Sequence, residues 1–163
     1  MLENKDNITI TLTNGDVIKA ELYPDVAPIT VENFEKLINE HFYDGLIFHR
    51  VIEGFMIQGG GYDENNVQKE ADSIKGEFAS NGVTNDLKHT RGVLSMARTS
   101  VPDSASSQFF IMHEDAPHLD GEYAAFGKVT EGMDAVDKIA SAPTDSQDKP
   151  ITPVVIQTIT LDE

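Results

Sequence analysis

The sequence contains no cysteine, and none of its 163 residues lies in a long hydrophobic run. Without cysteine there are no disulfide bonds, thiolate nucleophiles or cysteine-ligated zinc, and the redox compartment stays open. A membrane helix requires about 20 consecutive apolar residues, and no segment approaches that length. The first residues, Met1 to Asp6, contain no apolar signal segment. We therefore expect a cytoplasmic protein without a membrane partner.

Basic residues are scarce, because 12 Lys and Arg stand against 28 Asp and Glu and give a formal net charge of -16. Such a surface repels nucleic-acid phosphates and anionic lipid headgroups, so neither is expected as a partner. The same surplus favours basic or unfolded polypeptides, although a contribution to solubility is the simpler interpretation.

The remaining composition is that of a folded protein, with 39% hydrophobic and 25% charged residues. The length falls within the usual range of one compact domain, and no linker, repeat or low-complexity tract divides the chain. We expect a single domain over residues 1–163. No feature indicates oligomerisation, so a monomer is the default expectation.

The N-terminal part predicts a hairpin followed by a helix. Apolar and polar residues alternate over 8–12, Asn14-Gly15 supplies a tight turn, and 17–22 resumes the extended pattern. Thr30 is the predicted N-cap of a helix that ends near His41, with apolar residues at helical spacing between them.

The rest of the chain consists mainly of short strands. A polar segment at 62–91 is long enough to indicate a functional or self-packed excursion, and a short helix is expected around Met133, Val136 and Ile139. Many short strands with only two helices favour an antiparallel barrel or sandwich over βαβ units. Further strands are expected at 46–52, 55–58, 92–97, 108–112, 123–129 and 154–161.

Several kinds of catalytic site have no support in the sequence. None of the five histidines falls in a tight metal-ligand spacing, so no metal site is expected. Gly59-Gly60-Gly61 is not followed by the Lys-Ser/Thr of a phosphate-binding loop, and no Gly-x-Ser-x-Gly motif indicates a serine hydrolase. We expect no cofactor.

One long motif does indicate a function: residues 48–60 read FHRVIEGFMIQGG. Further segments follow in order: ELYP at 21–24 with TVENF at 30–34, GVLSMA at 92–97, SQFFI at 107–111, and HLDG at 118–121 running into FGKV at 126–129. Together they resemble the cyclophilin family over nearly the whole chain, and MART at 96–99 resembles its bacterial members.

The resemblance implies a mainly β fold, a closed eight-stranded antiparallel barrel capped by two α-helices, with the active groove on its outer face. It implies a peptidyl-prolyl cis/trans isomerase that binds proline-containing peptides and unfolded proteins and assists their folding. The main alternative is a non-catalytic chaperone or scaffold module that binds proline peptides on the same barrel. Arg50 favours the enzyme, because a barrel without catalysis would be expected to lose this donor.

The resemblance also assigns the candidate site. Arg50 would be the catalytic hydrogen-bond donor, and Gln58 would orient the substrate backbone. The period of a strand places Met56 and Gln58 on one face, and likewise Gln108 and Phe110. The proline pocket would be formed by Phe55, Met56, Phe110 and Leu119, and the residues preceding the proline would meet Ala97, Arg98 and Gln108.

Three residues of this expected site depart from the family pattern. Arg98 replaces a common asparagine, and Tyr123 stands where the family usually has a histidine. His118 stands where many members have the tryptophan that is linked to tight binding of cyclosporin. We therefore expect a weakened affinity for cyclosporin together with an intact proline pocket.

Overall fold

The structure is a computed structural model and describes residues 5–162. The expectation about Met1 to Asp6 falls mostly on residues 1–4, which lie outside the described part. Within residues 5–162, no helix has the length and apolar character needed to cross a bilayer.

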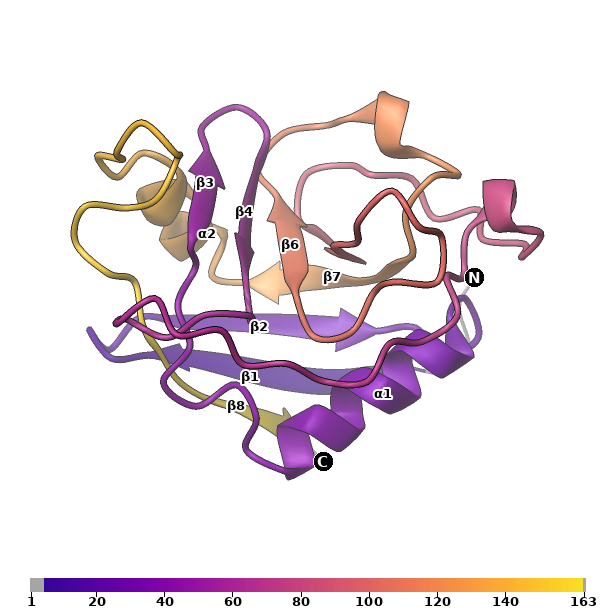
Figure 1. The fold of residues 1–163 in the computed structure, drawn as a ribbon, viewed down its shortest axis with the longest axis horizontal. Coiled ribbons are helices and arrows are strands. Elements are labelled where there is room, and N and C mark those ends of the chain that lie inside the picture. Colours follow the sequence, from indigo (N-terminus) through magenta and orange to yellow (C-terminus); the bar gives the residue numbers. More distant parts are fainter. Residues whose placement is uncertain (1–4, 163) are drawn as a thin grey trace.

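Eight strands form one antiparallel sheet in the order β3-β4-β6-β5-β7-β2-β1-β8. The first hairpin lies where the sequence predicts it, and Figure 1 shows β3, β4 and β6 side by side above the long strands β1 and β2. The strands are β1 (Asp6–Leu12), β2 (Val17–Leu22), β3 (Arg50–Ile52), β4 (Met56–Gly59), β5 (Val93–Met96), β6 (Phe109–Met112), β7 (Ala125–Glu131) and β8 (Ile156–Asp162).

The sheet curls strongly, but the expectation of a closed barrel was overstated. Among the described residues, the edge strands β3 and β8 share no ladder. The segment before β3 is joined to the start of β8 by backbone hydrogen bonds of Ile156 with Gly45 and Leu46, each 2.8 Å long, and by an isolated bridge between Ile47 and Val155. Beside it, the N–H of Phe48 donates to the carbonyl of Val154 at 3.1 Å. The strand predicted over 46–52 is correspondingly reduced to β3.

Within the described part of the chain, two α-helices complete the fold, as expected. They are α1 (Pro28–Asn39) and α2 (Met133–Ala140). The prediction that Thr30 is the N-cap of α1 was wrong, because the helix begins two residues earlier at Pro28, whose fixed φ suits the first turn. Thr30 lies inside this first turn, and its N–H and hydroxyl both donate to the Glu77 carboxylate, at 2.6 and 2.8 Å.

Two apolar clusters lie on opposite faces of the curled sheet. The larger one fills the interior, where the Phe34 ring lies 5.1 to 5.3 Å from the rings of Tyr43, Phe109 and Phe126. The smaller one covers the outer face of β4, β5 and β6 and contains Met56, Val93, Phe110, Met112, Ala116, Leu119 and Ala125. This outer cluster supports the surface on which the predicted site residues gather.

The predicted polar excursion runs from β4 to β5 and contains only one short 3₁₀ helix, Ala79–Asn81. It packs back onto the protein through buried side chains, including Phe78, which is 1% exposed. The amide of Asn85 donates to the carbonyls of Glu77 and Ala125, which fastens the excursion to β7. It is therefore a self-packed segment.

Candidate functional site

The site is built on a row of residues that crosses adjacent strands. Arg50 on β3 lies opposite Gln58 on β4, and Gln58 lies opposite Phe110 on β6. Residues directly opposite each other in an antiparallel pair project to the same face. One polar, one charged and one aromatic side chain thus rise together on the outer face of the sheet.

These side chains border a small cavity of about 110 Å³. All of its lining residues were predicted from the sequence as site residues. They are Arg50, Phe55, Met56, Gln58, Ala97, Arg98, Phe110, Leu119 and Tyr123.

The floor of the cavity is apolar and tightly packed. Met56, Phe110 and Leu119 are 2%, 4% and 7% exposed, because they belong to the outer cluster. The ring of Tyr123 meets Phe110 edge to face at a centroid distance of 5.7 Å. This arrangement can hold a small apolar ring and exclude water around it.

Arg50 is the exposed member of the row. Within residues 5–162, its guanidinium has no carboxylate within ion-pair distance and forms no side-chain hydrogen bond. An arginine stays protonated at any working pH and carries donors in a rigid planar arrangement. Arg50 therefore places a permanent hydrogen-bond donor, whose N–H groups are unused, beside an apolar cavity.

Gln58 is held in place by Gln108, one of the two predicted site residues that do not line the cavity. The Gln58 amide nitrogen donates to the Gln108 amide oxygen at 3.0 Å. Gln108 instead lines an adjoining polar cavity of about 210 Å³. This second cavity is lined by Gln58, Gln68, Ala97, Arg98, Thr99, Ser104, Ser106 and Gln108.

Arg98 lines both cavities, as Gln58 and Ala97 also do. Its Nε and Nη2 donate to the carbonyl of Glu122 at 3.1 and 2.6 Å, and its Nη1 donates to the carbonyl of Thr99 at 2.8 Å. Its guanidinium carbon lies 4.7 Å from the ring centroids of both Phe78 and Tyr123. The side chain is thereby fixed on several sides.

His118 is the other predicted site residue that does not line the cavity. It is exposed on the 3₁₀ turn Pro117–Leu119, which directs the neighbouring Leu119 into the cavity and His118 away from it. The His118 ring stacks on Phe55 with a centroid distance of 5.8 Å and an interplanar angle of 30°. It therefore reaches the pocket through Phe55.

Sequence reasoning missed a buried histidine behind the pocket floor. His89 is 1% exposed, and its ring stacks on Phe110 at 6.1 Å and 21°. Its Nε2 lies 2.9 Å from the Ser95 hydroxyl and its Nδ1 lies 3.0 Å from the Asp120 carboxylate. The contacts join residues 6 and 31 positions apart, so no spacing pattern in the sequence could have revealed them.

The environment of His89 keeps its imidazole neutral. Burial lowers the pKa of His89, although the adjacent Asp120 carboxylate opposes this shift. Burial by itself would raise the pKa of Asp120, but the backbone N–H and ring of His89 outweigh it, and the net direction is downward. With Asp120 ionised, Nδ1 carries the proton and Nε2 accepts a hydrogen bond from Ser95.

The Ser95-His89-Asp120 set has the order of contacts found in serine hydrolases. A nucleophilic serine must reach its substrate, whereas Ser95, beside Phe110 on the neighbouring strand, is 0% exposed. The set therefore supports the pocket floor and offers no nucleophile to the surface.

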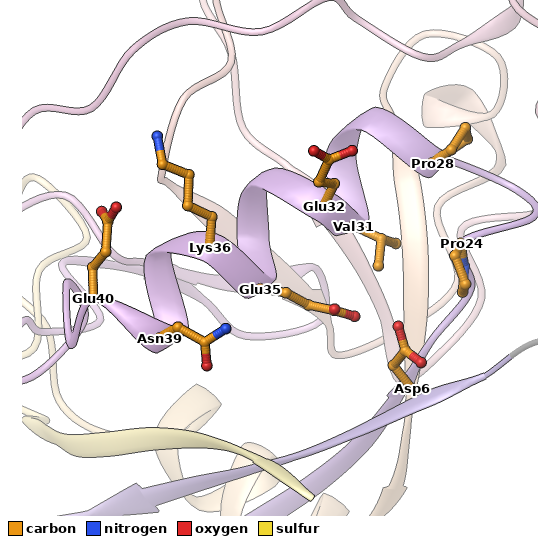
Figure 2. Close-up of a pocket in the computed structure, with 9 residues that line it drawn as sticks. All are labelled: Asp6, Pro24, Pro28, Val31, Glu32, Glu35, Lys36, Asn39 and Glu40. Atoms are coloured by element: carbon orange, nitrogen blue, oxygen red, sulfur yellow. The ribbon is translucent and has the colours of Figure 1, made fainter. Parts of the chain in front are cut away.

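A larger hollow lies elsewhere, between α1 and the start of β1 (Figure 2), and has a volume of about 660 Å³. It contains none of the predicted site residues and is lined by several carboxylates, including those of Asp6 and Glu35, which point toward one another in Figure 2. Burial, together with a hydrogen bond and repulsion from Asp6, raises the pKa of Glu35 to about 7. Among residues 5–162, no group of three or more potential ligands is placed to hold a metal ion.

The chain is similar to known proteins along nearly its full length. The family model described as "Cyclophilin type peptidyl-prolyl cis-trans isomerase/CLD" matches residues 7–161. A peptidyl-prolyl cis-trans isomerase of Acinetobacter baylyi is 53% identical over 88% of this chain and 79% of its own. Peptidyl-prolyl cis-trans isomerase B of Escherichia coli is 43% identical over 96% of this chain and 99% of its own.

A solved structure agrees with the fold. The crystal structure of a Cryptosporidium parvum cyclophilin type peptidyl-prolyl cis-trans isomerase has a TM-score of 0.84 at 30% identity, covering 98% of this chain and 99% of its own. A second structure of that protein, determined in the presence of the dipeptide Ala-Pro, has a TM-score of 0.82 at 32% identity, covering 96% of this chain and 99% of its own.

Proposed function

The chain belongs to the cyclophilin-type peptidyl-prolyl cis-trans isomerases and is such an enzyme, and we propose that Arg50 and the apolar cavity beside it carry out the reaction. The observation behind the proposal is the Arg50 guanidinium, unpaired at the rim of a cavity that is otherwise lined mainly by apolar side chains. Nothing in the related proteins supports a non-catalytic binding module.

The reaction breaks no covalent bond, but it rotates a peptide bond against a barrier of about 18 to 20 kcal/mol. In the twisted transition state the amide loses resonance, and the prolyl nitrogen regains a lone pair that accepts a hydrogen bond. A donor fixed beside that nitrogen stabilises the transition state more than the planar ground states. Arg50 is suited to be this donor, since no described residue competes for its N–H groups.

Arg50 alone does not provide the whole acceleration. Shortening a process of about 100 s to about 1 ms requires roughly 7 kcal/mol. A hydrogen bond to a charged group contributes about 1.5 to 3 kcal/mol. The balance falls to Gln58, which would hold the substrate backbone, and to the cavity floor, which would exclude water from the prolyl ring.

The related Cryptosporidium parvum structure was determined with the dipeptide Ala-Pro, and the family binds proline-containing peptides. By analogy, we propose that a prolyl ring enters the 110 Å³ cavity over Met56, Phe110 and Leu119. Unfolded and flexible polypeptides would then be the substrates. A monomeric state, a cytoplasmic location and the weakened cyclosporin affinity stay predictions.

The proposal is tested by measuring cis/trans exchange of an X-Pro peptide by NMR. We expect the intact protein to accelerate exchange and Arg50→Ala to reduce kcat/KM roughly 10- to 150-fold, which corresponds to losing one charge-assisted hydrogen bond. Arg50→Lys keeps the charge without the planar donors and should fall between the two. Full activity of Arg50→Ala would assign the donor to another residue.

A further inference from the structure

The two adjoining cavities differ from the rest of the molecule in charge. The chain carries 28 acidic residues, yet none of them lines either cavity. Two of its three arginines, Arg50 and Arg98, do. By contrast, four carboxylates line the hollow beside α1. The two cavities together form a groove, and its lining is positively charged although the protein as a whole is acidic.

Arg98 has a charge that no described carboxylate neutralises. Within residues 5–162, its guanidinium takes part in no ion pair, and its acceptors are the neutral carbonyls of Glu122 and Thr99. The Glu122 carboxylate is engaged elsewhere, by the Ser80 hydroxyl at 2.9 Å. A half-buried cation without a counter-charge has lost part of its hydration without ionic compensation.

The guanidinium also has unused donors. Arginine carries five N–H groups, and three of them donate to carbonyls here, which leaves two. The rings of Phe78 and Tyr123 and the three hydrogen bonds hold the planar group in one orientation. A fixed guanidinium with free donors is suited to bind a carboxylate.

We propose that Arg98 selects substrates that carry an acidic residue within three residues of the isomerised proline, with the carboxylate entering the polar cavity. The inference rests on the proposed entry of the prolyl ring into the apolar cavity. The two cavities share Gln58, Ala97 and Arg98, so a peptide seated in one has its neighbouring residues beside the other. Three extended residues span about 10 Å, which sets the limit on the position.

The test compares prolyl peptides that differ only by Glu or Gln at each position within three residues of the proline. Glu and Gln have the same shape, so the ratio of their kcat/KM values isolates the charge. At low salt we expect the intact protein to favour Glu by roughly 3- to 10-fold at one or more positions, and the ratio to shrink as salt screens the pair.

The variants identify the residue responsible. Arg98→Gln should bring the Glu/Gln ratio to about 1, and Arg98→Lys should retain a preference for Glu. The matched control is Lys128→Gln, which removes the same charge from an exposed position on β7 that lines neither cavity. This control should keep both the activity and the ratio of the intact protein.

The outcomes separate the two proposals. If the intact protein accelerates Glu and Gln peptides equally at every position, the acid preference is wrong while the proposed isomerase site stands. If Arg98→Gln keeps the full preference, another group is responsible and the assignment to Arg98 is overturned. If no peptide is accelerated at all, both proposals fail. The measurement on the intact protein decides the preference even where a variant folds poorly.

Discussion

The three arginines of the chain make different contacts, and these contacts indicate different roles. Arg91 pairs with Asp137 through two nitrogens, at 2.7 and 2.8 Å, and also donates to the carbonyl of His113 at 2.9 Å. Arg98 donates to carbonyls only, and Arg50 has no such partner among the described residues. An arginine whose charge is paired with a carboxylate of its own fold stabilises structure, whereas one without a counter-charge is available to a ligand.

Truncating Arg91 should therefore reduce stability, whereas truncating Arg50 should reduce activity. Arg91→Ala is expected to lower the free energy of unfolding by about 1 kcal/mol, because it removes a bidentate but partly exposed ion pair, and to leave kcat/KM unchanged. Chemical denaturation and the NMR exchange assay measure the two quantities. Loss of activity in Arg91→Ala at a temperature where it is fully folded would contradict this separation.

The residue expected to weaken cyclosporin binding is His118, which lies against Phe55 at the edge of the pocket. Replacing it with tryptophan enlarges the apolar surface beside Phe55, so we expect His118→Trp to bind cyclosporin more tightly than the intact protein. Titration of both proteins with cyclosporin measures the change. Equal affinities would show that this position does not set the inhibitor preference.

Site residues on short strands were predictable because strands alternate their side chains and because the motif at 48–60 is long. The alternation placed Met56 and Gln58 on one face of their strand, whereas the expected role of Arg50 came from the resemblance of the motif to the cyclophilin family. His89 was not predictable, since it joins the site only through the packing of the 62–91 excursion against Phe110. Tertiary contacts of this kind leave no periodic signal in the sequence.

At the scale of elements, α1 shows where local rules fail. Thr30 has the residue type of an N-cap, but Pro28 starts the helix and Glu77, from a distant segment, binds Thr30 instead. The apolar face of the helix was predicted correctly, because Val31, Phe34, Leu37 and Ile38 are buried as their spacing indicates. Periodicity thus located the buried face, while a tertiary contact determined the helix start.

The contact between α1 and β1 should make the stability depend on pH. As a carboxylate, Glu35 has a buried oxygen without a donor among the described residues, and it bonds to Asp6 only through a shared proton. The pKa of Glu35 is raised from 4.5 to about 7, so the folded state holds a proton that the unfolded state has released. The resulting stabilisation is complete below pH 4.5 and is lost as the pH rises through about 7.

Glu35→Gln removes this ionisation and supplies an amide donor to Asp6. We expect the variant to be more stable than the intact protein at pH 8, by about 1 kcal/mol or less because solvent screens the pair, and to lose the stability change between pH 4.5 and 7. Denaturation midpoints measured from pH 4.5 to 8 test this expectation. Parallel pH profiles for the two proteins would show that the pair does not titrate in this range.

At the scale of the whole molecule, the charges are segregated. A net charge of -16 repels acidic peptides at long range, whereas the groove with Arg50 and Arg98 attracts them at short range. The screening length of about 8 to 10 Å at physiological salt limits the repulsion to the near surface. From composition, solubility was the simpler interpretation of the acidic surplus and basic or unfolded partners were the alternative. Only the folded structure brings Arg50 and Arg98 together in cavities that no carboxylate lines.

Because the sheet does not close into a barrel, Arg50 and the pocket floor are held by different numbers of neighbouring strands. Phe110 lies on an inner strand with neighbours on both sides, whereas Arg50 belongs to an edge strand of three residues. Beyond that strand, the N–H of Val51 bonds to the carbonyl of Asp148, in the loop that leads to β8. Amino-acid changes in this loop can therefore shift Arg50 without moving Phe110. Among relatives, the rate of isomerisation and the affinity for the peptide can then change independently of each other.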